Sequence, residues 1–300
     1  MRVILIGSVN SSKIVLEEIL KTEIEIIKVY ALGEEYSKNV SGYFPIHRIA
    51  NENGIPYETF QKINNEKYIN EIEMLSPDYI FVVGLSQLVD NRIIKAAKKG
   101  TIGFHPTPLP QFRGRAAMVW QVLLGVRESK CTFFLIDEGM DSGSIIGQEE
   151  YIIGENDYAK DVENNLYHAL RRLCVKTLER MEKDEIEPVM QDESKATYLL
   201  RRTPEDGKID WEKPIEQIYR LIRGTSRPYP GAFSYYDGKN KVIIWHAECR
   251  ENKKYIGMPG QIAAVTEDSF DVVCVDGLLH VDEYETDRTL PFLVGHRMKG

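Results

Sequence analysis

Apolar and polar positions alternate in blocks along the first half of the chain, and the blocks predict strands separated by helices. Short apolar runs bounded by turn residues are typical of buried strands, and they occur at Arg2–Ile6, Glu25–Leu32, Tyr79–Val83, Thr101–Phe104 and Cys131–Ile136. A short strand at Tyr57–Thr59 and helical spacing between the runs complete the pattern, with helices at Ser11–Thr22, Ile46–Asn53, Glu66–Leu75, Asn91–Lys98 and Ala116–Leu124. This alternation predicts an α/β fold with a Rossmann-like, doubly wound and mostly parallel sheet.

The first strand-to-helix turn differs from a dinucleotide-binding turn. Gly7-Ser8 follows the first strand, and Ser11 or Ser12 is placed to cap the helix that runs to about Thr22. The sequence here lacks the GxGxxG fingerprint. We interpret Gly7-Ser8 as a tight turn, with a substrate close to that turn as the functional alternative.

The pattern changes in the second half of the chain. Leu166–Lys183 has the spacing of a long amphipathic helix, preceded by a loop and cap at Glu155–Val162. Composition shifts near Pro188, and Asp192–Ile209 is polar and turn-rich before a helix at Ile215–Arg223. Short strands follow at Ala232–Tyr236, Lys241–Ala247, Gly260–Val265, Ser269–Val275 and Leu278–Tyr284. The sequence therefore predicts a Rossmann-like catalytic domain over residues 1–190, a connector over 191–230 that contributes to the substrate site, and a smaller β-rich, barrel-like domain over 231–300.

Composition and charge narrow the possible functions. A chain of 300 residues with 43% hydrophobic content can bury a sizeable core. Its net charge of −8 argues against a broad nucleic-acid or membrane surface, although a local arginine cluster can still hold a small anion. The four cysteines lack CxxC spacing, so we expect no zinc site, no disulfide framework and a cytoplasmic location. Apolar runs of signal-peptide or membrane-spanning length are missing, which predicts a soluble protein.

The segment from Gly100 to Gln148 contains the sharpest candidates for chemistry. His105 ends a predicted strand and precedes a loop that three prolines stiffen. Because ligands bind beyond the carboxyl ends of strands in open α/β sheets, we expect His105 to meet Asp141, which follows the Cys131–Ile136 strand. Histidine suits proton transfer near neutral pH, and a nearby carboxylate holds one ring tautomer. A structural role for His105 and an Asx-turn role for Asp141 remain alternatives.

Arginine side chains supply the candidates for anion binding. Guanidinium groups recognise phosphate or carboxylate through paired donors, so Arg113 and Arg115 are candidate ligand contacts. Arg201, Arg202, Arg223 and Arg227 add possible anion contacts, with solvent exposure as the alternative for each arginine. Trp211 and Tyr229 are candidates for stacking on a base, with core packing as the alternative. The remaining histidines show no metal-ligand spacing, so no metal is expected.

Several motifs together resemble one enzyme family. The stretch GFHPTPLPQFRGRAAMVW resembles the HxSLLPxxxG region of formyltransferases that use 10-formyltetrahydrofolate, and DEGMDSG resembles their downstream aspartate loop. The motifs GRAAMVW, GLSQL, RRTPEDGKIDW and RPYPGAF look like the sugar N-formyltransferases rather than the methionyl-tRNA or glycinamide-ribonucleotide branches. The resemblance extends from Arg2 to Phe233, and the remaining tail fits a general barrel-like C-terminal module.

The resemblance implies transfer of a formyl group from N10-formyltetrahydrofolate to the amine of a nucleotide-linked amino sugar in bacterial surface glycan synthesis. The acceptor would be a 4-amino-4,6-dideoxy hexose on UDP or dTDP, as in a branch acting in pseudaminic acid synthesis. His105 and Asp141 match the family's catalytic histidine and aspartate. By resemblance the folate contacts are Leu85, Ser86, Gln87, Leu88, Arg115, Asp137, Glu138 and Gly139. The predicted substrate contacts, from the arginine candidates and the family's connector, are Arg113, Arg201, Arg202, Asp206, Trp211, Arg227 and Tyr229. The sugar branch also implies a homodimer formed through the C-terminal region.

One position departs from the family pattern. The family triad begins with an asparagine two residues before the histidine, where this chain has Gly103. Losing one such oxyanion donor costs about 3 kcal/mol in a preorganised site. We expect a backbone N–H, a water molecule or a nearby side chain to replace the amide. Non-catalytic binding of folate or of a nucleotide sugar is one alternative function. Methionyl-tRNA formylation is the other, and the net charge of −8 counts against it because RNA binding needs a basic surface.

Overall fold

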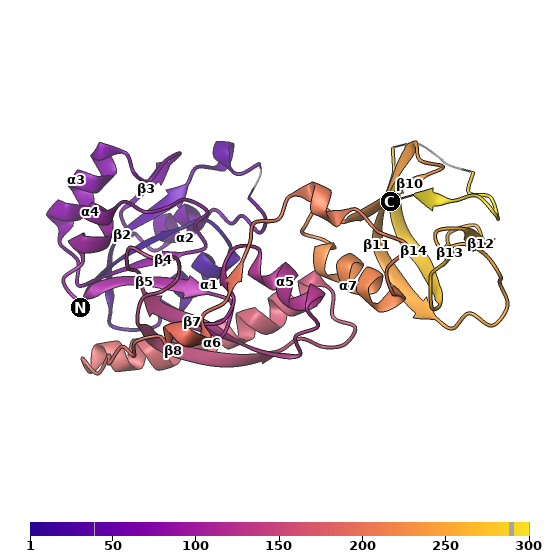
Figure 1. The fold of residues 1–300 in the computed structure, drawn as a ribbon. Coiled ribbons are helices and arrows are strands. Elements are labelled where there is room, and N and C mark those ends of the chain that lie inside the picture. The colour runs from indigo at the N-terminus through magenta and orange to yellow at the C-terminus, as the bar shows by residue number, and fades with distance from the viewer. Residues whose placement is uncertain (39, 288–290, 300) are drawn as a thin grey trace. The chain divides into compact units, whose positions relative to one another are not determined.

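The computed structural model describes residues 1–38, 40–287 and 291–299, which divide into two compact units (Figure 1). Unit 1 comprises Met1–Ala117, Glu128–Ile152 and Asn164–Leu199, and unit 2 comprises Met118–Arg127, Ile153–Glu163 and the described part of Leu200–Gly300. The predicted domain over 231–300 therefore includes four positions, 288–290 and 300, that lie outside the described residues.

Unit 1 is built on a seven-stranded sheet with the order β3-β2-β1-β4-β5-β7-β8. The five parallel strands are β1 (Arg2–Gly7), β2 (Glu25–Leu32), β3 (Tyr57–Phe60), β4 (Tyr79–Val83) and β5 (Gly100–His105). Two strands, β7 (Glu128–Leu135) and β8 (Ile145–Ile152), continue the sheet in antiparallel pairing. The predicted mostly parallel sheet is thus confirmed. Because the chain builds the sheet on one side of β1 and then returns to the other side at β4, the carboxyl ends of β1 and β4 form the crevice where such sheets bind ligands.

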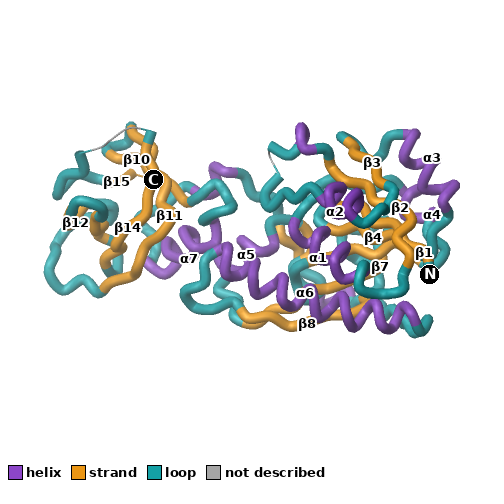
Figure 2. Tube along the Cα trace, turned by 180° about the vertical axis from the view of Figure 1, so that it is seen from behind, coloured by secondary structure: helices purple, strands orange, loops and turns teal. Residues whose placement is uncertain are grey.

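Helices cover both faces of this sheet. α1 (Asn10–Ile19) and α2 (Ile46–Glu52) lie on one face, and α3 (Glu66–Leu75) and α4 (Asn91–Ala96) lie on the other. The long helix α6 (Ala159–Glu182) lies beside α1, where Arg171 donates hydrogen bonds to Glu17 and Glu18 (Figure 2). One core lies between the sheet and the helices α3 and α4. It is filled by apolar side chains from β1, β2, β3, β4, α3 and α4: Ile4, Ile6, Tyr30, Phe60, Ile69, Ile72, Ile80 and Ile93.

The start of α1 corrects the predicted helix cap. Val9 is the N-cap, so Ser12 lies inside the first turn rather than before it. Its hydroxyl accepts hydrogen bonds from the N–H groups of Ser8 and Val9 and donates one to the carbonyl of Val83. A Cβ atom at Gly7 would lie 2.3 Å from Ser12 Oγ, so this close approach requires glycine. The Ser12 hydroxyl therefore connects the turns after β1 and β4 through hydrogen bonds to Ser8, Val9 and Val83, and it does not act as the N-cap of α1.

Two further elements differ from the sequence prediction. β8 was not predicted, because it is an edge strand whose polar GQEE segment lacks a continuous apolar run. α6 begins at Ala159, where a loop and cap were predicted, since Val162 already belongs to the buried face that continues through Leu166. The remaining short elements up to residue 199 are η1 (Glu34–Tyr36), β6 (Arg113–Gly114), α5 (Ala117–Leu123), η2 (Glu193–Lys195) and β9 (Tyr198–Leu199).

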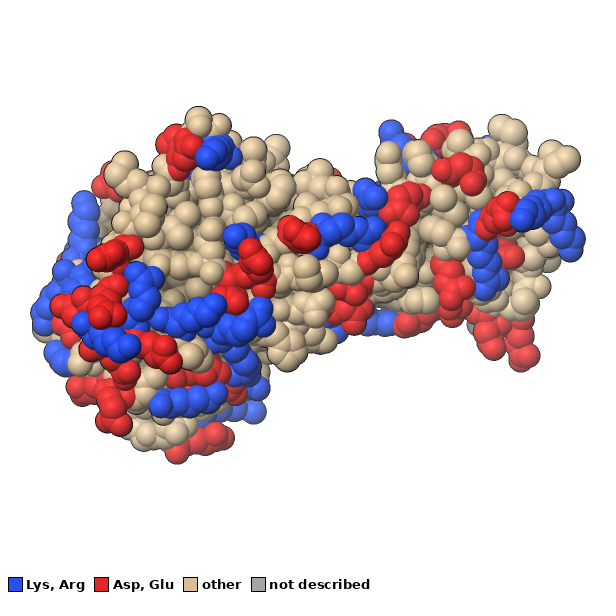
Figure 3. Space-filling model, turned by 90° about the horizontal axis from the view of Figure 1, so that it is seen from below, with Lys and Arg blue, Asp and Glu red and all other residues tan. Residues whose placement is uncertain are grey.

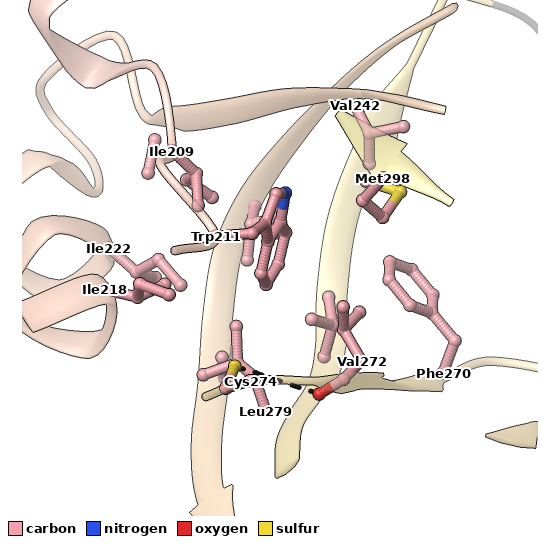
Figure 4. Packing of buried hydrophobic residues seen from close by; sticks show 14 of the residues in the cluster. Ile209, Trp211, Ile218, Ile222, Val242, Phe270, Val272, Cys274, Leu279 and Met298 are labelled. Carbon is pink, nitrogen blue, oxygen red and sulfur yellow. Dashed lines mark hydrogen bonds between the residues drawn. The ribbon is translucent and has the colours of Figure 1, made fainter. Parts of the chain in front are cut away.

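Unit 2 contains a six-stranded antiparallel sheet with the order β12-β13-β14-β11-β10-β15. Its elements are η3 (Pro204–Gly207), α7 (Ile215–Thr225), β10 (Ala232–Tyr236), β11 (Asn240–Arg250), β12 (Ile262–Val265), β13 (Phe270–Val273), β14 (Leu278–Thr286) and β15 (Met298–Lys299). α7 packs against β11, and the space between them is filled by apolar side chains around Trp211 (Figure 4). The predicted smaller β-rich module is therefore present.

The surface carries charges of both signs. On the face shown in Figure 3, lysine and arginine side chains are interspersed with aspartate and glutamate side chains. Within the described residues, no helix is long and apolar enough to cross a membrane. The same residues include no cluster of three or more histidine, cysteine, aspartate or glutamate side chains placed to hold a metal ion.

Candidate active site

His105 is the last residue of β5, between parallel β4 and antiparallel β7. Only 6% of the residue is exposed, so the ring is held inside the carboxyl edge of the sheet. Its Nε2 lies 2.8 Å from the carbonyl oxygen of Phe112, which fixes Nε2 as a donor. The predicted position at the end of a buried strand is thus occupied by an oriented imidazole.

Asp141 comes from the loop between β7 and β8 and meets the other ring nitrogen. Its Oδ2 atom lies 3.7 Å from His105 Nδ1 and accepts a 2.8 Å hydrogen bond from the backbone N–H of Gly114. The Asx-turn role that the sequence left open belongs to Asp137 instead, whose Oδ1 accepts from Gly139 N and Ser142 Oγ. The structure therefore brings His105 and Asp141 together across the sheet edge.

The two ring nitrogens of His105 both face oxygen acceptors. A neutral imidazole has one N–H and satisfies one of them, whereas the imidazolium form donates toward both Phe112 and Asp141. Nδ1 is thus the ring nitrogen that lies beside a carboxylate, an arrangement used by groups that assist proton transfer and stabilise developing negative charge.

The proline loop after His105 is fixed by side chains from β7 and β8. Thr132 Oγ1 donates to the carbonyl of Thr107 at 2.6 Å, and Tyr151 OH donates to the carbonyl of Pro106 at 2.9 Å. Gln148 Nε2 donates to the carbonyl of Leu109 at 2.9 Å. Because the loop carries the Phe112 carbonyl that receives His105 Nε2, these three bonds also fix the imidazole.

A cavity of about 410 Å³ opens at the carboxyl ends of β1, β2 and β4. Three predicted folate residues, Leu85, Ser86 and Gln87, line it. The remaining lining residues are Ser8, Leu32, Glu35, Tyr36, Lys38, Val40 and Gln61. The size falls within the range of small-molecule sites. Gln87 also has a structural task, because its amide bonds the backbone of Gln61 and Ile63.

The other predicted folate residues lie at or near the surface of unit 1. Leu88 is 85% exposed and is not among the residues that line the cavity. Arg115 is exposed, and its backbone N–H donates to the carbonyl of Leu199. Glu138 lies 3.5 Å from Lys95 in a solvent-exposed ion pair. Gly139 belongs to the loop that the Asp137 carboxylate organises.

Arg113 is buried, in contrast to the ligand contact that the sequence predicted. Its five guanidinium donors make five hydrogen bonds, to Gln191 Oε1 twice, to both carboxylate oxygens of Glu193 and to Tyr198 OH. The residue is 1% exposed, and burial opposes the charge, but the Glu193 hydrogen bonds dominate and keep the pKa of Arg113 above its ordinary value. Its side chain is therefore committed to tying β6 to the segment before β9.

The predicted substrate residues of unit 2 fall into two groups. Trp211 is 4% exposed, and its Nε1 donates to Ser234 Oγ at 2.9 Å, so it is a core residue and is withdrawn as a base-stacking contact (Figure 4). Trp211 also borders a second cavity of about 450 Å³, whose described lining includes none of the other predicted substrate residues. Asp206 receives hydrogen bonds from Thr203 N and Oγ1, so its carboxylate caps η3.

The second group of predicted substrate residues in unit 2 consists of three arginines and one tyrosine. Arg202 lies 4.9 Å over the ring of Trp120 and donates to the carbonyl of Asp206. Burial lowers the pKa of Arg202, which identifies a partly desolvated cation. Arg227 pairs with Glu283 and lies over Trp245, and Tyr229 OH approaches Met118 Sδ at 3.8 Å. Arg201 is exposed.

Gly103 faces apolar side chains rather than a polar space. A Cβ atom there would lie 2.8 Å from Phe134 Cζ and 3.0 Å from Ile136 Cγ1. The volume that an asparagine side chain would need is thus occupied by Phe134. The glycine and the phenylalanine are complementary, so the departure from the family pattern is built into the packing of β5 against β7.

Sequence reasoning missed three contributors to these sites. Gln191 joins Arg113 to the Asp141 loop, and the polar stretch that contains it gave no periodic signal. Trp120 was predicted as part of a helix and of the GRAAMVW motif but was given no site role, although its Nε1 donates to the carbonyl of Leu200 and its face carries Arg202. The segment from Glu35 to Lys38 lines the unit 1 cavity, and a charged loop after a buried strand was the available signal.

Comparison with solved structures places this fold among known proteins. HypX from Aquifex aeolicus, determined in complex with tetrahydrofolic acid, matches with a TM-score of 0.68 and 19% identity over 96% of this chain. This chain spans 44% of the HypX chain, so it covers less than half of that protein.

Two further structures match over nearly their whole lengths. An N-formyltransferase from Helicobacter canadensis, in complex with folinic acid and dTDP-3-aminofucose, matches with a TM-score of 0.68 and 21% identity over 94% of this chain and 99% of its own. The methionyl-tRNA formyltransferase from Clostridium thermocellum matches with a TM-score of 0.58 and 21% identity over 92% of this chain and 100% of its own. At these identities the likeness establishes the fold.

Family models give the stronger result. The formyl transferase model matches residues 1–178, which include β1 through most of α6 with His105 and Asp141. The model of the formyl transferase C-terminal domain matches residues 201–291, which include α7 and most of the antiparallel sheet. With more than half of its length matched and an imidazole and a carboxylate paired at the sheet edge, the chain belongs to the formyl transferase family.

Proposed function

We propose that the protein transfers a formyl group from N10-formyltetrahydrofolate to the amine of a nucleotide-linked amino sugar. The observation that carries the proposal is the pairing of His105 with Asp141 in a chain of this family, with Nδ1 and Oδ2 3.7 Å apart at the carboxyl edge of the sheet. Among the described residues of unit 1, His105 is the one buried imidazole, and it has a carboxylate within 4 Å.

The proposed reaction is an acyl transfer. The neutral amine of the sugar attacks the formyl carbon, and a new C–N bond forms as the carbonyl oxygen becomes an oxyanion. Collapse of this intermediate breaks the bond between the formyl carbon and N10 of the folate, and the proton lost by the amine passes through His105 to N10, so that tetrahydrofolate leaves. An imidazolium beside Asp141 stabilises charge that appears only on the way to the intermediate, which is the condition for acceleration.

The folate is proposed to lie against the segment after β4. The cavity walls formed by Leu85, Ser86 and Gln87 support this placement, because they offer an apolar side chain beside backbone and hydroxyl groups. The folate supplies the activated formyl group. The predicted contacts Leu88, Arg115, Asp137, Glu138 and Gly139 stay part of the proposal, with Asp137 acting through the loop that it organises.

The sugar acceptor is proposed from the connector and from the family likeness. The motifs RRTPEDGKIDW and RPYPGAF resemble the sugar branch. A structural neighbour was solved with dTDP-3-aminofucose. Arg201, Arg202, Arg227 and Tyr229 remain proposed nucleotide-sugar contacts, and the partly desolvated Arg202 on Trp120 suits a phosphate. A 4-amino-4,6-dideoxy hexose on UDP or dTDP is the proposed acceptor, with the pseudaminic branch as one setting. A cytoplasmic homodimer is the proposed form of the protein.

The test is a product assay. Purified protein is incubated with N10-formyltetrahydrofolate and a panel of UDP- and dTDP-linked amino sugars, and products are identified by mass. A formylated sugar that disappears with His105→Ala is the expected result. Formylation of methionyl-tRNA in place of every sugar would transfer the protein to the tRNA branch, and no product on any acceptor would overturn the proposed activity.

Binding measurements separate catalysis from sensing. If the protein bound folate and a nucleotide sugar without turnover, and His105→Ala bound both equally well, the non-catalytic alternative would replace the proposal. Gly103 is the reason to make this measurement, because the position offers no side-chain amide to the oxyanion.

A further inference from the structure

Asp141 needs support from outside its own loop. Its φ angle of +52° lies in the left-handed region, which residues with a Cβ atom adopt less readily than glycine. Such a conformation persists only where surrounding contacts determine it. The single bond to its carboxylate from Gly114 N fixes Oδ2 but not the backbone that carries it. Something else must hold the loop at the distance from which the carboxylate reaches His105.

The side-chain amide of Gln191 holds the Asp141 loop in place. The Nε2 group donates to the backbone carbonyl of Asp141 at 2.8 Å and to that of Gly143 at 2.7 Å. The residue is 9% exposed, so both hydrogen bonds are shielded from water. The two acceptors lie on either side of Ser142, so one amide clamps the turn that presents the carboxylate.

Gln191 is itself held in one orientation. Its Oε1 accepts from Arg113 Nε at 3.1 Å and from Arg113 Nη2 at 2.8 Å. The guanidinium is locked in turn by Glu193 and Tyr198. Flipping the amide would turn its N–H groups toward the guanidinium and its oxygen toward two carbonyls, so the network permits a single orientation. Arg113 and Gln191 thus form a buried brace from β6 to the Asp141 loop.

We infer that Gln191 is a positioning residue that keeps the Asp141 carboxylate beside His105, with Arg113 as its anchor. The inference depends on the proposed function only for the catalytic consequence of that position. A carboxylate 3.7 Å from the ring has little room for displacement, and misplacement by about 1 Å costs on the order of 100-fold in rate. Gln191 is buried, does not line the unit 1 cavity and donates to the backbone of the Asp141 loop, so we assign its effect to the position of Asp141.

A nearly isosteric substitution isolates this role. Gln191→Glu keeps two oxygens for Arg113 but removes the N–H donors and places a carboxylate against the carbonyls of Asp141 and Gly143. The matched control is Gln217→Glu on the exposed face of α7, where the side chain has solvent on its outer side. Gln191→Met, which has neither donor nor acceptor, replaces Gln191→Glu if that variant fails to fold.

Two readouts are taken on each variant. Imidazole nitrogen resonances of ¹⁵N-histidine protein, assigned with His105→Gln, report the protonation of His105 across pH. Steady-state assays report kcat and KM. For Gln191→Glu we expect the His105 titration to shift in the direction seen for Asp141→Asn. We also expect kcat to fall about 10- to 100-fold, with KM for the folate changed less than about twofold. Gln217→Glu should match the wild type in both.

The inference is overturned if Gln191→Glu leaves the His105 titration at its wild-type position, whatever happens to kcat. A loss of kcat without that shift would show that the residue acts elsewhere. Failure of the wild-type protein to formylate any amino sugar would sink the proposed function instead. The nitrogen resonances would still decide whether Gln191 holds Asp141 against His105.

Discussion

The loop cluster around His105 and the core around Trp211 are held together by different kinds of contact. In unit 1, Arg113, Gln191 and Asp141 are buried polar groups whose hydrogen bonds run through one another to a catalytic candidate. In unit 2, Trp211 is surrounded by isoleucine, valine and phenylalanine, and its one polar atom is satisfied by Ser234. A hydrogen-bonded polar network fixes the orientation of each side chain in it, whereas apolar packing requires only that the side chains fill the available volume.

This difference makes it possible to separate the positioning of catalytic groups from the stability of the fold. A substitution in the unit 1 network should change where a charge lies with a modest change in folding. A substitution in the unit 2 core should change folding and leave the chemistry alone.

Removing either partner of the proposed catalytic pair should have the largest effect. His105→Ala and Asp141→Ala each lose most of the activity while folding normally, because general acid–base groups contribute about 10²- to 10⁴-fold. Initial rates of sugar formylation and circular dichroism measure the two properties. His168→Ala, at an exposed position of α6, is the control. Wild-type rates in both site variants would refute the assignment.

Truncating the centre of the unit 2 core comes next. Trp211→Ala should lower the free energy of unfolding of unit 2 by about 3–5 kcal/mol, since the indole is 4% exposed and a cavity would replace it. Thermal and denaturant unfolding measure this loss, and Trp211→Phe should cost less. If Trp211→Phe instead raised KM for a nucleotide sugar without affecting stability, the ring would be a ligand contact after all.

Restoring the family's asparagine should fail on steric grounds. Gly103→Asn places a side chain 2.8 Å from Phe134 Cζ, so we expect overpacking to cost about 1–3 kcal/mol and activity not to rise. Adding Phe134→Leu should recover part of the stability by freeing space. Melting temperature and kcat are measured for both variants. A single Gly103→Asn variant that is as stable as the wild type and faster would show that the space is open.

The smallest expected effect is on the stability of the fold at acidic pH. Burial of Glu18 raises its pKa, but hydrogen bonds from Lys21 and Arg171 outweigh burial and leave the pKa below the ordinary value. A depressed carboxyl pKa stabilises the fold above the unfolded-state value of about 4.3, and that stability is lost as pH falls through the folded value. Unfolding free energies between about pH 3 and pH 7 should therefore fall less steeply in Glu18→Gln than in the wild type. The exposed Glu187→Gln variant should follow the wild-type curve.

Local patterns were enough to predict most of the elements. β2, α3, β4 and β10 have the bounds that apolar runs and helix signals gave, because each is specified by its own residues. The edge strand β8 was missed because its polar face is stabilised by pairing with β7 and packing of α6, which local pattern does not encode.

The candidate site was predictable in part. His105 and Asp141 were paired in advance because strand ends meet at one edge of an open sheet, and the structure places them 3.7 Å apart. The fates of Arg113 and Trp211 were not predictable, since the same residue types serve as ligand contacts or as buried supports depending on their neighbours.

The sequence by itself determined the alternation of strands and helices, the strand-end histidine and the family motifs, since each depends on residues close along the chain. Tertiary structure alone decided that Gln191 braces Asp141, that Phe134 fills the space beside Gly103 and that Arg113 is enclosed. These outcomes depend on partners up to 80 positions apart, as between Arg113 and Glu193. Only the folded packing fixes which donor faces which acceptor.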